Sequence, residues 1–173
     1  MNLKRLGKKI VEISYKEGNF TLSSGKRSNY IFDKYAFETR PKVLEEITRK
    51  MVKMVTGETS KIAGMELGGV PLATALSLKT GLPFVIVRKG SKGYGIDRTI
   101  EGDLNDEDKV VIVEDISTTG TQTLLTAKII ESTGASVLKI ICVVDREEGA
   151  RKRIENRGYK FEPLFTKSSL GIK

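Results

Sequence analysis

Residues 110–122 constrain the fold of this chain more than any other segment. They begin with four β-branched residues, pass through the adjacent acids Glu114 and Asp115 and a turn rich in Ser, Thr and Gly, and then enter a helical pattern. Such an apolar run is typical of a strand buried on both faces. A strand that leads through a small hydroxyl-rich loop into a helix presents free backbone N–H groups to an anion. The segment predicts a phosphate site, with the two acids facing sugar hydroxyls, a metal or a developing positive charge on the same ligand.

The rest of the chain alternates between strand and helix patterns. Pro41 opens one helix and Gly57 ends it. The tail adds a short helix near residues 150–156 and a strand near 159–164. This alternation predicts an α/β fold with a mostly parallel central sheet flanked by helices. The helix that Pro41 opens is expected at residues 41–55. The other expected strands lie at residues 61–65, 82–88, 109–113 and 135–144, and the other expected helices at residues 2–17, 72–79 and 121–132.

Four polar or glycine-containing segments fall where predicted strands end. They are a turn at residues 68–71, a charged stretch without apolar period at 89–102, the acidic pair, and residues 145–146. In open α/β sheets, ligands bind beyond the carboxyl ends of the strands. We therefore expect these segments to form one site.

Length and composition fit one soluble domain. The chain has 173 residues, 39% of them hydrophobic and 30% charged, which is enough for a proper core. No apolar run is long enough to span a bilayer, and no long apolar segment follows the basic N-terminus as a secretory signal requires. The single cysteine, Cys142, lies in an apolar run and is expected to be a buried thiol. These features predict a cytoplasmic protein with no membrane contact.

Charge and residue types narrow the chemistry. The chain contains no histidine, which excludes histidine acid–base catalysis, Ser-His-Asp triads and histidine-ligated metals. Its net charge of +8 indicates anionic partners. The basic residues are not interleaved with aromatic residues, as they are in proteins that bind single-stranded nucleic acid. The pattern favours a small anionic ligand over nucleic acid.

The predicted phosphate site resembles the phosphoribosyl pyrophosphate (PRPP) signature of the type I phosphoribosyltransferases. That signature has four apolar residues, two acids, two spacers and a Thr-small-Gly-Thr loop. The resemblance implies that the loop holds the 5-phosphate and that Glu114 and Asp115 meet the ribose hydroxyls. The alternative is an ordinary strand–turn–helix junction capped by Ser or Thr. The PRPP residues expected after the acids are Ile116, Ser117, Thr118, Thr119, Gly120, Thr121 and Gln122.

Residues 87–95 resemble the mobile catalytic loop of the orotate phosphoribosyltransferases. Arg88, Lys89 and Lys92 match its cations, and three cations can neutralise a departing pyrophosphate. The glycines of the segment allow such a loop to close over the ligand. Tyr94 stands where the family often has histidine and can donate a hydrogen bond to pyrophosphate. Taken alone, the segment could equally be a basic surface loop.

Residues 20–33 resemble the segment that forms a hood over the base in the same family. They contain two expected short strands around a Ser-Gly turn. The resemblance places Phe32 against the pyrimidine. Ser23 replaces a family lysine, and Lys26 is near enough in sequence to substitute for it. The alternative is a plain hairpin with an aromatic core residue.

Arg146 follows the strand expected at 135–144, where the orotate enzymes have Asp-Arg-x-Glu. The resemblance implies that this arginine, with Thr118, contacts orotate, since a guanidinium suits a carboxylate. A surface ion pair of Arg146 with Glu147 or Glu148 is the alternative.

A third loop completes the resemblance. Residues 64–71 fit the pyrophosphate loop, in which backbone amides of Leu67, Gly68 and Gly69 would bind the leaving group. Many orotate enzymes carry Tyr-Lys at the positions of Leu67 and Gly68, so a side-chain charge is missing here. The alternative is a tight turn before a helix.

The resemblance covers residues 15–150 and implies an orotate phosphoribosyltransferase of pyrimidine (UMP) biosynthesis. Such an enzyme makes orotidine 5-monophosphate and pyrophosphate from orotate and PRPP with Mg²⁺, which the substrate rather than protein side chains would hold. Lys92, Glu114 and Asp115 are the expected catalytic residues. One domain is expected over residues 1–173, with its core at about 40–150 and a hood from about 1–35 plus the C-terminal segment.

The resemblance also implies a homodimer in which residues 89–102 reach the neighbouring site. Two other functions remain open. One is phosphoribosyl transfer to another base, such as a purine or uracil. The other is a ligand-sensing regulator on the same fold that binds PRPP without turnover.

Overall fold

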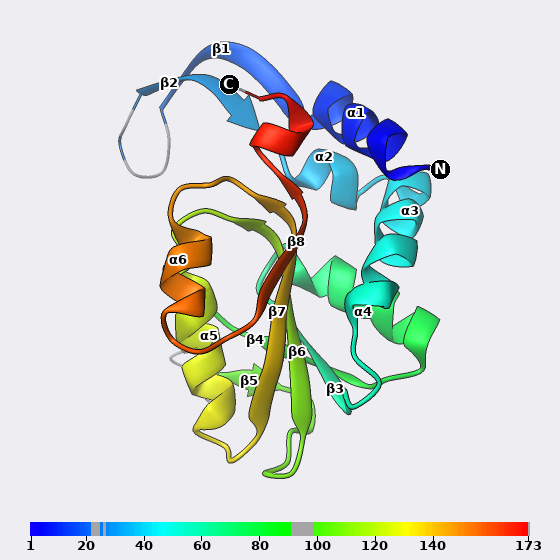
Figure 1. Ribbon diagram of the computed structural model, residues 1–173, viewed down its shortest axis with the longest axis vertical. Helices are drawn as coiled ribbons and strands as arrows, with labels where there is room; N and C mark the ends of the chain where they lie inside the picture. The colour runs from blue at the N-terminus through cyan, green and yellow to red at the C-terminus, as the bar shows by residue number, and fades with distance from the viewer. Residues whose placement is uncertain (22–24, 26, 91–98, 173) are drawn as a thin grey trace.

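The computed structural model describes residues 1–21, 25, 27–90 and 99–172 (Figure 1). In chain order, their helices and strands are α1 (Leu3–Ser14), β1 (Tyr15–Thr21), β2 (Arg27–Phe32), α2 (Tyr35–Glu38), α3 (Pro41–Met51), the 3-10 turn η1 (Val52–Met54), β3 (Lys61–Met65), α4 (Gly69–Thr80), β4 (Phe84–Val87), β5 (Ile100–Glu101), β6 (Lys109–Ser117), α5 (Thr121–Glu131), β7 (Ser136–Asp145), α6 (Ala150–Glu155), β8 (Phe161–Thr166) and the 3-10 turn η2 (Ser168–Leu170).

The strands form two sheets. The larger one has the order β5-β4-β3-β6-β7-β8, and β1 pairs with β2 in a separate sheet. In the larger sheet β4, β3, β6, β7 and β8 are parallel, while β5 runs antiparallel to β4. The predicted α/β fold with a mostly parallel central sheet flanked by helices is confirmed.

Helices cover both faces of the larger sheet, α3 and α4 on one and α5 and α6 on the other (Figure 1). Val111 and Val113 pack with α4, whereas Val110 and Ile112 pack with α5. Successive strand side chains point to opposite faces, so a strand covered on both sides needs an apolar residue at every position. Cys142 is free and fully buried, as predicted.

The hood forms as an antiparallel pair in which Tyr15 lies opposite Phe32. The two expected short strands are therefore confirmed, but the first begins at Tyr15, because α1 ends at Ser14 rather than at the predicted residue 17. The hood lies beside the C-terminal turn η2 at one end of the sheet (Figure 1).

Strand β6 is longer than its apolar run predicts. The expected strand ends at residue 113, but the pairing with β7 continues to Ser117, which lies opposite Asp145. Glu114 and Asp115 are therefore strand residues rather than turn residues. Polar side chains end an apolar pattern, but a strand ends where its neighbour stops pairing.

The helices also differ in detail from the sequence pattern. The predicted turn at 68–71 is wrong, because α4 begins at Gly69 and its first turn contains Pro71, a position where the missing N–H costs no helical bond. The sequence pattern did not predict three short elements, α2, η2 and β5. Strand β5 lies within the charged stretch at 89–102. Within the described part of the chain, no helix combines the length and apolar character needed to cross a bilayer.

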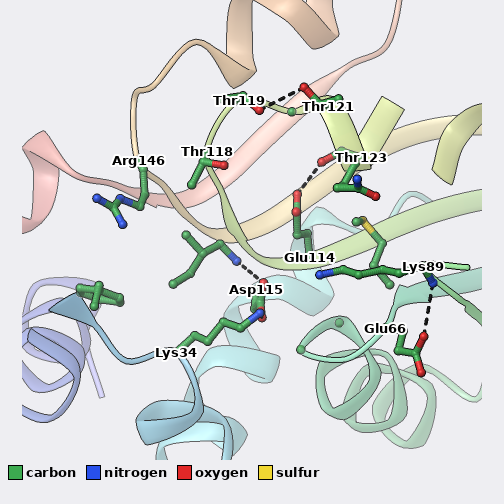
Figure 2. A pocket seen from close by; sticks show the side chains of 17 residues that line it. Lys34, Glu66, Lys89, Glu114, Asp115, Thr118, Thr119, Thr121, Thr123 and Arg146 are labelled. Carbon is green, nitrogen blue, oxygen red and sulfur yellow. Dashed lines mark hydrogen bonds and ion pairs between the residues drawn. The ribbon is translucent and has the colours of Figure 1, made fainter. Parts of the chain in front are cut away.

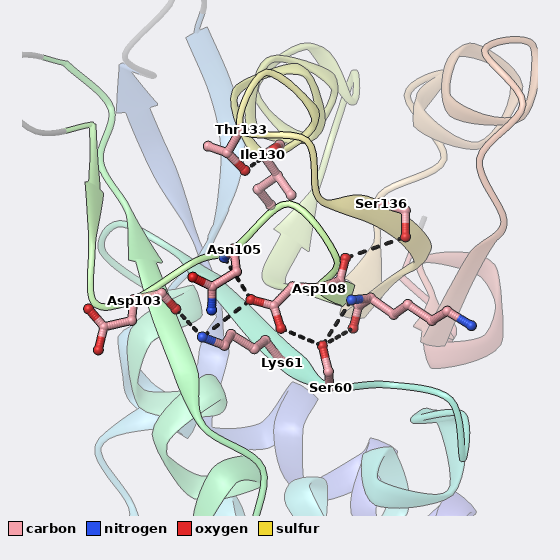
Figure 3. A network of polar contacts seen from close by, with 9 residues as sticks. Ser60, Lys61, Asp103, Asn105, Asp108, Ile130, Thr133 and Ser136 are labelled. Atoms are coloured by element: carbon pink, nitrogen blue, oxygen red, sulfur yellow. Dashed lines mark hydrogen bonds and ion pairs between the residues drawn. The ribbon is translucent and has the colours of Figure 1, made fainter.

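A polar network joins β3 to β6 at the end of the sheet opposite the hood (Figure 3). The Asp108 carboxylate accepts hydrogen bonds from the Ser60 hydroxyl at 2.8 Å and the Asn105 backbone N–H at 2.8 Å. The Lys61 ammonium lies 3.3 Å from the same carboxylate. These contacts hold the starts of two central strands together.

Candidate active site

A cavity of about 360 Å³ lies at the carboxyl ends of the central strands (Figure 2). It brings together segments from the hood, the loop before α4, strand β6, the start of α5 and the end of β7. This is the edge at which the sequence predicted one site. The predicted residues that line it are Phe32, Gly68, Gly69, Lys89, Glu114, Asp115, Ile116, Thr118, Thr119, Gly120, Thr121, Gln122 and Arg146.

Three other predicted site residues, which the structure does describe, do not line this cavity. The Arg88 guanidinium lies 3.7 Å from the Glu101 carboxylate of β5, away from the described lining. Ser117 is buried in β6, and Leu67 is 58% exposed. The remaining three, Lys26, Lys92 and Tyr94, lie outside the described residues.

The start of α5 forms an anion cradle. The first N–H groups of a helix have no helical acceptor and carry the positive end of its dipole. Gly120 precedes the helix with φ 72°, and a Cβ there would lie 3.1–3.2 Å from Ile154 and Ala150. Glycine is therefore needed for this turn. The hydroxyls of Thr119 and Thr121, 3.1 Å apart, stand at the same rim (Figure 2).

Glu114 points to the α5 side of β6. Its carboxylate accepts a hydrogen bond from the Thr123 hydroxyl at 2.7 Å (Figure 2). Burial raises the pKa of Glu114 to about 7; the Thr123 bond opposes this rise, and the Asp115 charge adds to it. This carboxyl group can therefore exchange its proton near neutral pH.

Asp115 points to the other face of β6, as its strand position requires. Its Oδ1 accepts the backbone N–H of Ile116 at 2.6 Å, and its Oδ2 lies 2.6 Å from the Lys34 ammonium. The Asp115 side chain is 6% exposed and that of Lys34 29%. The two acids thus point to opposite faces of the sheet, at the carboxyl end of β6 where the cavity lies.

The loop before α4 approaches β6 closely. A Cβ on Gly68 would lie 1.5 Å from Asp115 Oδ2, and one on Gly69 would lie 2.6 Å from the Val113 carbonyl oxygen. Both distances are shorter than real contacts, so only glycine fits. The Glu66–Leu67 peptide bond just before is cis. Because neither Gly68 nor Gly69 carries a side chain, the backbone of this loop can reach a ligand that lies against the acidic pair.

One cation and one acid face the cavity from the neighbouring loops. Lys89 lines it, and the Lys89 backbone N–H donates to the Glu66 carboxylate at 3.3 Å (Figure 2). Glu66 lines the same cavity.

Phe32 and Arg146 close the cavity from the hood side. Phe32 is 9% exposed and packs near Phe37. The Arg146 guanidinium donates a hydrogen bond to the Tyr30 hydroxyl at 2.8 Å, and its Nε lies 3.0 Å from the Glu148 carboxylate. The ion pair that was the alternative interpretation is present, and Arg146 nevertheless lines the cavity.

Sequence reasoning missed four residues around the acidic pair. Lys34, Glu66 and Thr123 line the cavity, and Glu38 lies buried beneath it at 4% exposure. Burial, followed by the charge of Asp115 and a hydrogen bond with it, raises the pKa of Glu38 to about 9. Glu38 follows directly on Phe37, and an acid beside a buried aromatic residue was the one local signal available.

Comparison with known proteins agrees with this geometry. The family model described as "Phosphoribosyl transferase domain" matches residues 36–161. The orotate phosphoribosyltransferase of Pyrococcus horikoshii is 49% identical over 165 residues, which cover 93% of this chain and 88% of that protein.

Two solved structures of Mycobacterium tuberculosis H37Rv orotate phosphoribosyltransferase are also similar. The complex with Fe(III) dicitrate has a TM-score of 0.87 at 31% identity, and the complex with PRPP a TM-score of 0.82 at 29% identity. Each alignment covers 98% of this chain and 99% of the other.

Proposed function

This chain belongs to the orotate phosphoribosyltransferases, within the phosphoribosyl transferase domain family, and from that premise we propose how its own residues transfer ribose 5-phosphate from PRPP to orotate. The observation that carries the proposal is one cavity in which an anion cradle, an acidic pair and a glycine loop meet an aromatic ring and an arginine.

PRPP lies across the end of β6. Its 5-phosphate occupies the anion cradle, bound by backbone N–H groups and hydroxyls of residues 118–122. Glu114 and Asp115 accept hydrogen bonds from the ribose hydroxyls. Because burial places the pKa of Glu114 at about 7, its ionised fraction, and with it the negative charge beside the ribose, grows as the pH rises through neutrality.

The pyrophosphate group lies over the glycine loop. The Gly68 and Gly69 backbones come close enough to bind it, and Lys89 faces it from the next loop. Lys92 adds the second charge, and Arg88 and Tyr94 act from the same segment. Lys92 is proposed on its match to the family loop, as it lies outside the described residues.

Mg²⁺ fits this site as a companion of the substrate. The chain has no histidine, its one cysteine is buried, and the cavity offers carboxylate and hydroxyl oxygens, which Mg²⁺ prefers. In the described part of the chain, no three acidic side chains gather as a metal site. We propose that its direct ligands come mostly from substrate and water, as is common for Mg²⁺ bound with substrate phosphates. When bound, Mg²⁺ supplies charge neutralisation on the pyrophosphate.

Orotate is held on the hood side. Phe32 packs against the pyrimidine ring, and Arg146 and Thr118 bind its carboxylate and carbonyl oxygens. Lys26 adds a charge from the hood turn. The Tyr30 hydroxyl and the Glu148 carboxylate hold the guanidinium of Arg146 in place.

The reaction requires charge stabilisation rather than a protein nucleophile. The bond between the anomeric carbon and the pyrophosphate oxygen breaks, and its electron pair leaves with pyrophosphate. A ring nitrogen of orotate then forms the new bond to that carbon, and the proton that this nitrogen carried passes to water or to the departing pyrophosphate. The ribose passes through an oxocarbenium-like state, which the negative charges of Glu114 and Asp115 stabilise, while Lys89 and Lys92 stabilise the leaving group.

We also propose the higher organisation that the family resemblance implies. The hood at about 1–35, with the C-terminal segment, serves the core at about 40–150 as one domain over residues 1–173. Two chains form a homodimer in which residues 89–102 reach the neighbouring site. The protein acts in the reducing cytoplasm, where a free buried thiol such as Cys142 is stable.

The shared site is tested by mixing two inactive variants. A Lys92→Ala chain keeps its acidic pair, and a Glu114→Gln/Asp115→Asn chain keeps its loop. If the loop acts across the dimer, mixing them restores part of the activity. No recovery after subunit exchange would remove this part of the proposal.

The activity is tested by following the loss of orotate absorbance with PRPP and Mg²⁺. We expect turnover that needs all three components and that falls at least about 100-fold in Lys92→Ala, the size of effect expected for a charge that acts in the transition state. Lys9→Ala, on the exposed face of α1, is the matched control. PRPP binding without turnover would instead point to another base or to a sensor.

A further inference from the structure

Two charged residues from outside the family signature converge on Asp115. Lys34 and Glu38 come from the segment that leads from the hood strand β2 through the short helix α2. Figure 2 shows the Lys34 ammonium pointing at the Asp115 carboxylate, at the 2.6 Å given above. The contact joins the hood segment to the centre of the sheet.

Glu38 approaches the same carboxylate beside Gly68. The point above Gly68 where a Cβ would stand lies 1.5 Å from Asp115 Oδ2 and 2.8 Å from Glu38 Oε1. Both carboxyl groups therefore occupy the space that the missing side chain of Gly68 leaves free. Two ionised carboxylates at such close range would repel each other strongly.

The surroundings of Glu38 disfavour its ionised form. Neither of its carboxyl oxygens receives a hydrogen bond from the described residues, and the side chain is almost completely buried. The helices α1 and α3, which pack against α2, turn apolar faces with residues such as Ile10 and Ile47 inward. The charged groups acting on Glu38 are Asp115, Lys34 and Asp33.

We propose that Glu38 and Lys34 are positioning residues for the reaction: the protonated Glu38 carboxyl group donates a hydrogen bond to the Asp115 carboxylate, the Lys34 ammonium pairs with it, and together they aim it at the ribose. The inference depends on the role proposed above for Asp115. It assigns a task to two residues that do not themselves touch the reacting atoms.

The contacts explain how Asp115 is aimed. A carboxylate offers about four acceptor positions. Lys34 and Glu38 approach from the side of Oδ2, and the Ile116 N–H takes one position on Oδ1. One position on Oδ1 remains for a ribose hydroxyl. Both neighbours can donate hydrogen bonds to the Asp115 carboxylate without taking the position that faces the cavity.

Protonation states support this assignment. Burial, the Asp115 charge and the hydrogen bond with Asp115 raise the pKa of Glu38 to about 9, so it holds its proton at neutral pH. Burial opposes the charge on Lys34, but the contact with Asp115 outweighs it and raises the pKa of Lys34 above its usual value. Lys34 therefore stays charged at every pH at which Glu38 is protonated.

The experiment compares two substitutions of Glu38 between pH 6 and pH 10. Glu38→Gln keeps a donor that cannot ionise, and Glu38→Met removes the donor. At pH 7.5 we expect kcat/KM for PRPP within about twofold of wild type for Glu38→Gln and about tenfold lower for Glu38→Met, as for the loss of a hydrogen bond to a charged group. The ratio of Glu38→Gln to wild type should rise to about tenfold at pH 10, because only wild-type Glu38 loses its proton.

Substrate ionisation affects all variants equally and cancels in the ratio of their kcat/KM values. Two lysine variants provide further measurements. Lys34→Met should lower kcat/KM about tenfold, as for a lost charge-assisted bond. Lys16→Met, which removes a hood lysine paired with Asp33 at 3.3 Å, should leave it near wild type.

The outcomes separate this inference from the proposed function. A flat ratio between pH 7 and pH 10 would overturn the role of Glu38, even if Glu38→Met failed to fold. If wild type bound PRPP but left orotate unchanged, the function would fail. The positioning role would then be tested by PRPP affinity in calorimetry, with the same variants and the same expected pH dependence.

Discussion

At the scale of the residue, two buried acids make this protein sensitive to pH. Burial raises the pKa of Glu114 to about 7 and that of Glu38 to about 9. In the unfolded chain both revert to ordinary values, so the folded state binds more protons between those values and the raised ones. Stability is therefore highest at low pH within this window and falls as the pH rises through the folded-state pKa values.

Glu38→Gln tests this linkage. Between pH 7 and pH 9, we expect the free energy of unfolding of wild type to fall with pH, since folded Glu38 holds a proton that the unfolded chain has already released. The Gln variant should show a shallower slope, because it has no proton to lose. Urea unfolding at several pH values measures both slopes, and equal slopes would contradict the assignment.

Thr123→Val tests the carboxylate beside it. The Thr123 hydroxyl stabilises ionised Glu114, so its removal should raise the pKa of Glu114 further above 7. We expect kcat/KM for PRPP to fall roughly fivefold at pH 7, as for the loss of one hydrogen bond of about 1 kcal/mol, and to recover in part at pH 8.5. Thr126→Val, also buried in α5, is the control. A loss that is independent of pH would speak against this cause.

The residues that sequence reasoning missed share one physical trait. Lys34 and Glu38 matter through their approach to Asp115, which is distant in sequence and close only in the fold. Residues 118–122 could be predicted as an anion cradle, which stays a prediction, because a turn and a helix start make such a site locally. A contact between a hood segment and the central strand leaves no such local pattern.

At the scale of the element, the contact that shapes the cavity is the packing of α4 on the central sheet. The Gly69 backbone lies so close to the Val113 carbonyl that a Cβ would stand 2.6 Å from its oxygen. The start of α4 can therefore reach the end of β6, and the cavity exists because these two elements touch.

Gly69→Ala should push the start of α4 away from β6. We expect a loss of about 1–3 kcal/mol in the free energy of unfolding, as for other overpacked sites, together with weaker PRPP binding. Gly57→Ala, where a Cβ meets nothing within 4 Å, should change neither. Urea unfolding and calorimetric PRPP titration measure the two effects, and unchanged PRPP affinity in Gly69→Ala would show that α4 is not needed at this position.

Element positions followed from periodicity, but element ends did not. Apolar runs locate β3, β6 and β7 because helices cover both faces of the sheet. The end of β6 at Ser117 depends on pairing with β7, and β5 exists because its two residues pair with β4. Pairing partners of this kind lie outside any local window.

At the scale of the whole molecule, the two ends of the sheet have separate tasks. The carboxyl end carries the cavity, and the opposite end carries the network around Asp108. Burial opposes ionisation of Asp108, but the Asn105 N–H, the Ser60 hydroxyl and Lys61 outweigh it and hold its pKa below the usual value. Its contribution to stability is therefore present above the ordinary aspartate pKa and is lost as the pH falls further.

Asp108→Asn should separate stability from activity. We expect a loss of about 1–3 kcal/mol in the free energy of unfolding near neutral pH, as for hydrogen bonds to a charged group, with kcat/KM for PRPP unchanged at a temperature where the variant is folded. Thermal unfolding and the orotate assay provide the two readings. A variant that is as stable as wild type would assign the network no structural role.

The strands at the two margins of the sheet have a bearing on solubility. An open margin is a template for another chain, and proteins guard such margins with short strands, charges or proline. Here β5 screens one side of β4 with two residues, and β8 carries Glu162 and Pro163 on the other margin. The two-residue strand β5 thus also protects β4 from fibrous self-association, so a deletion that removed β5 would leave β4 as a template for another chain.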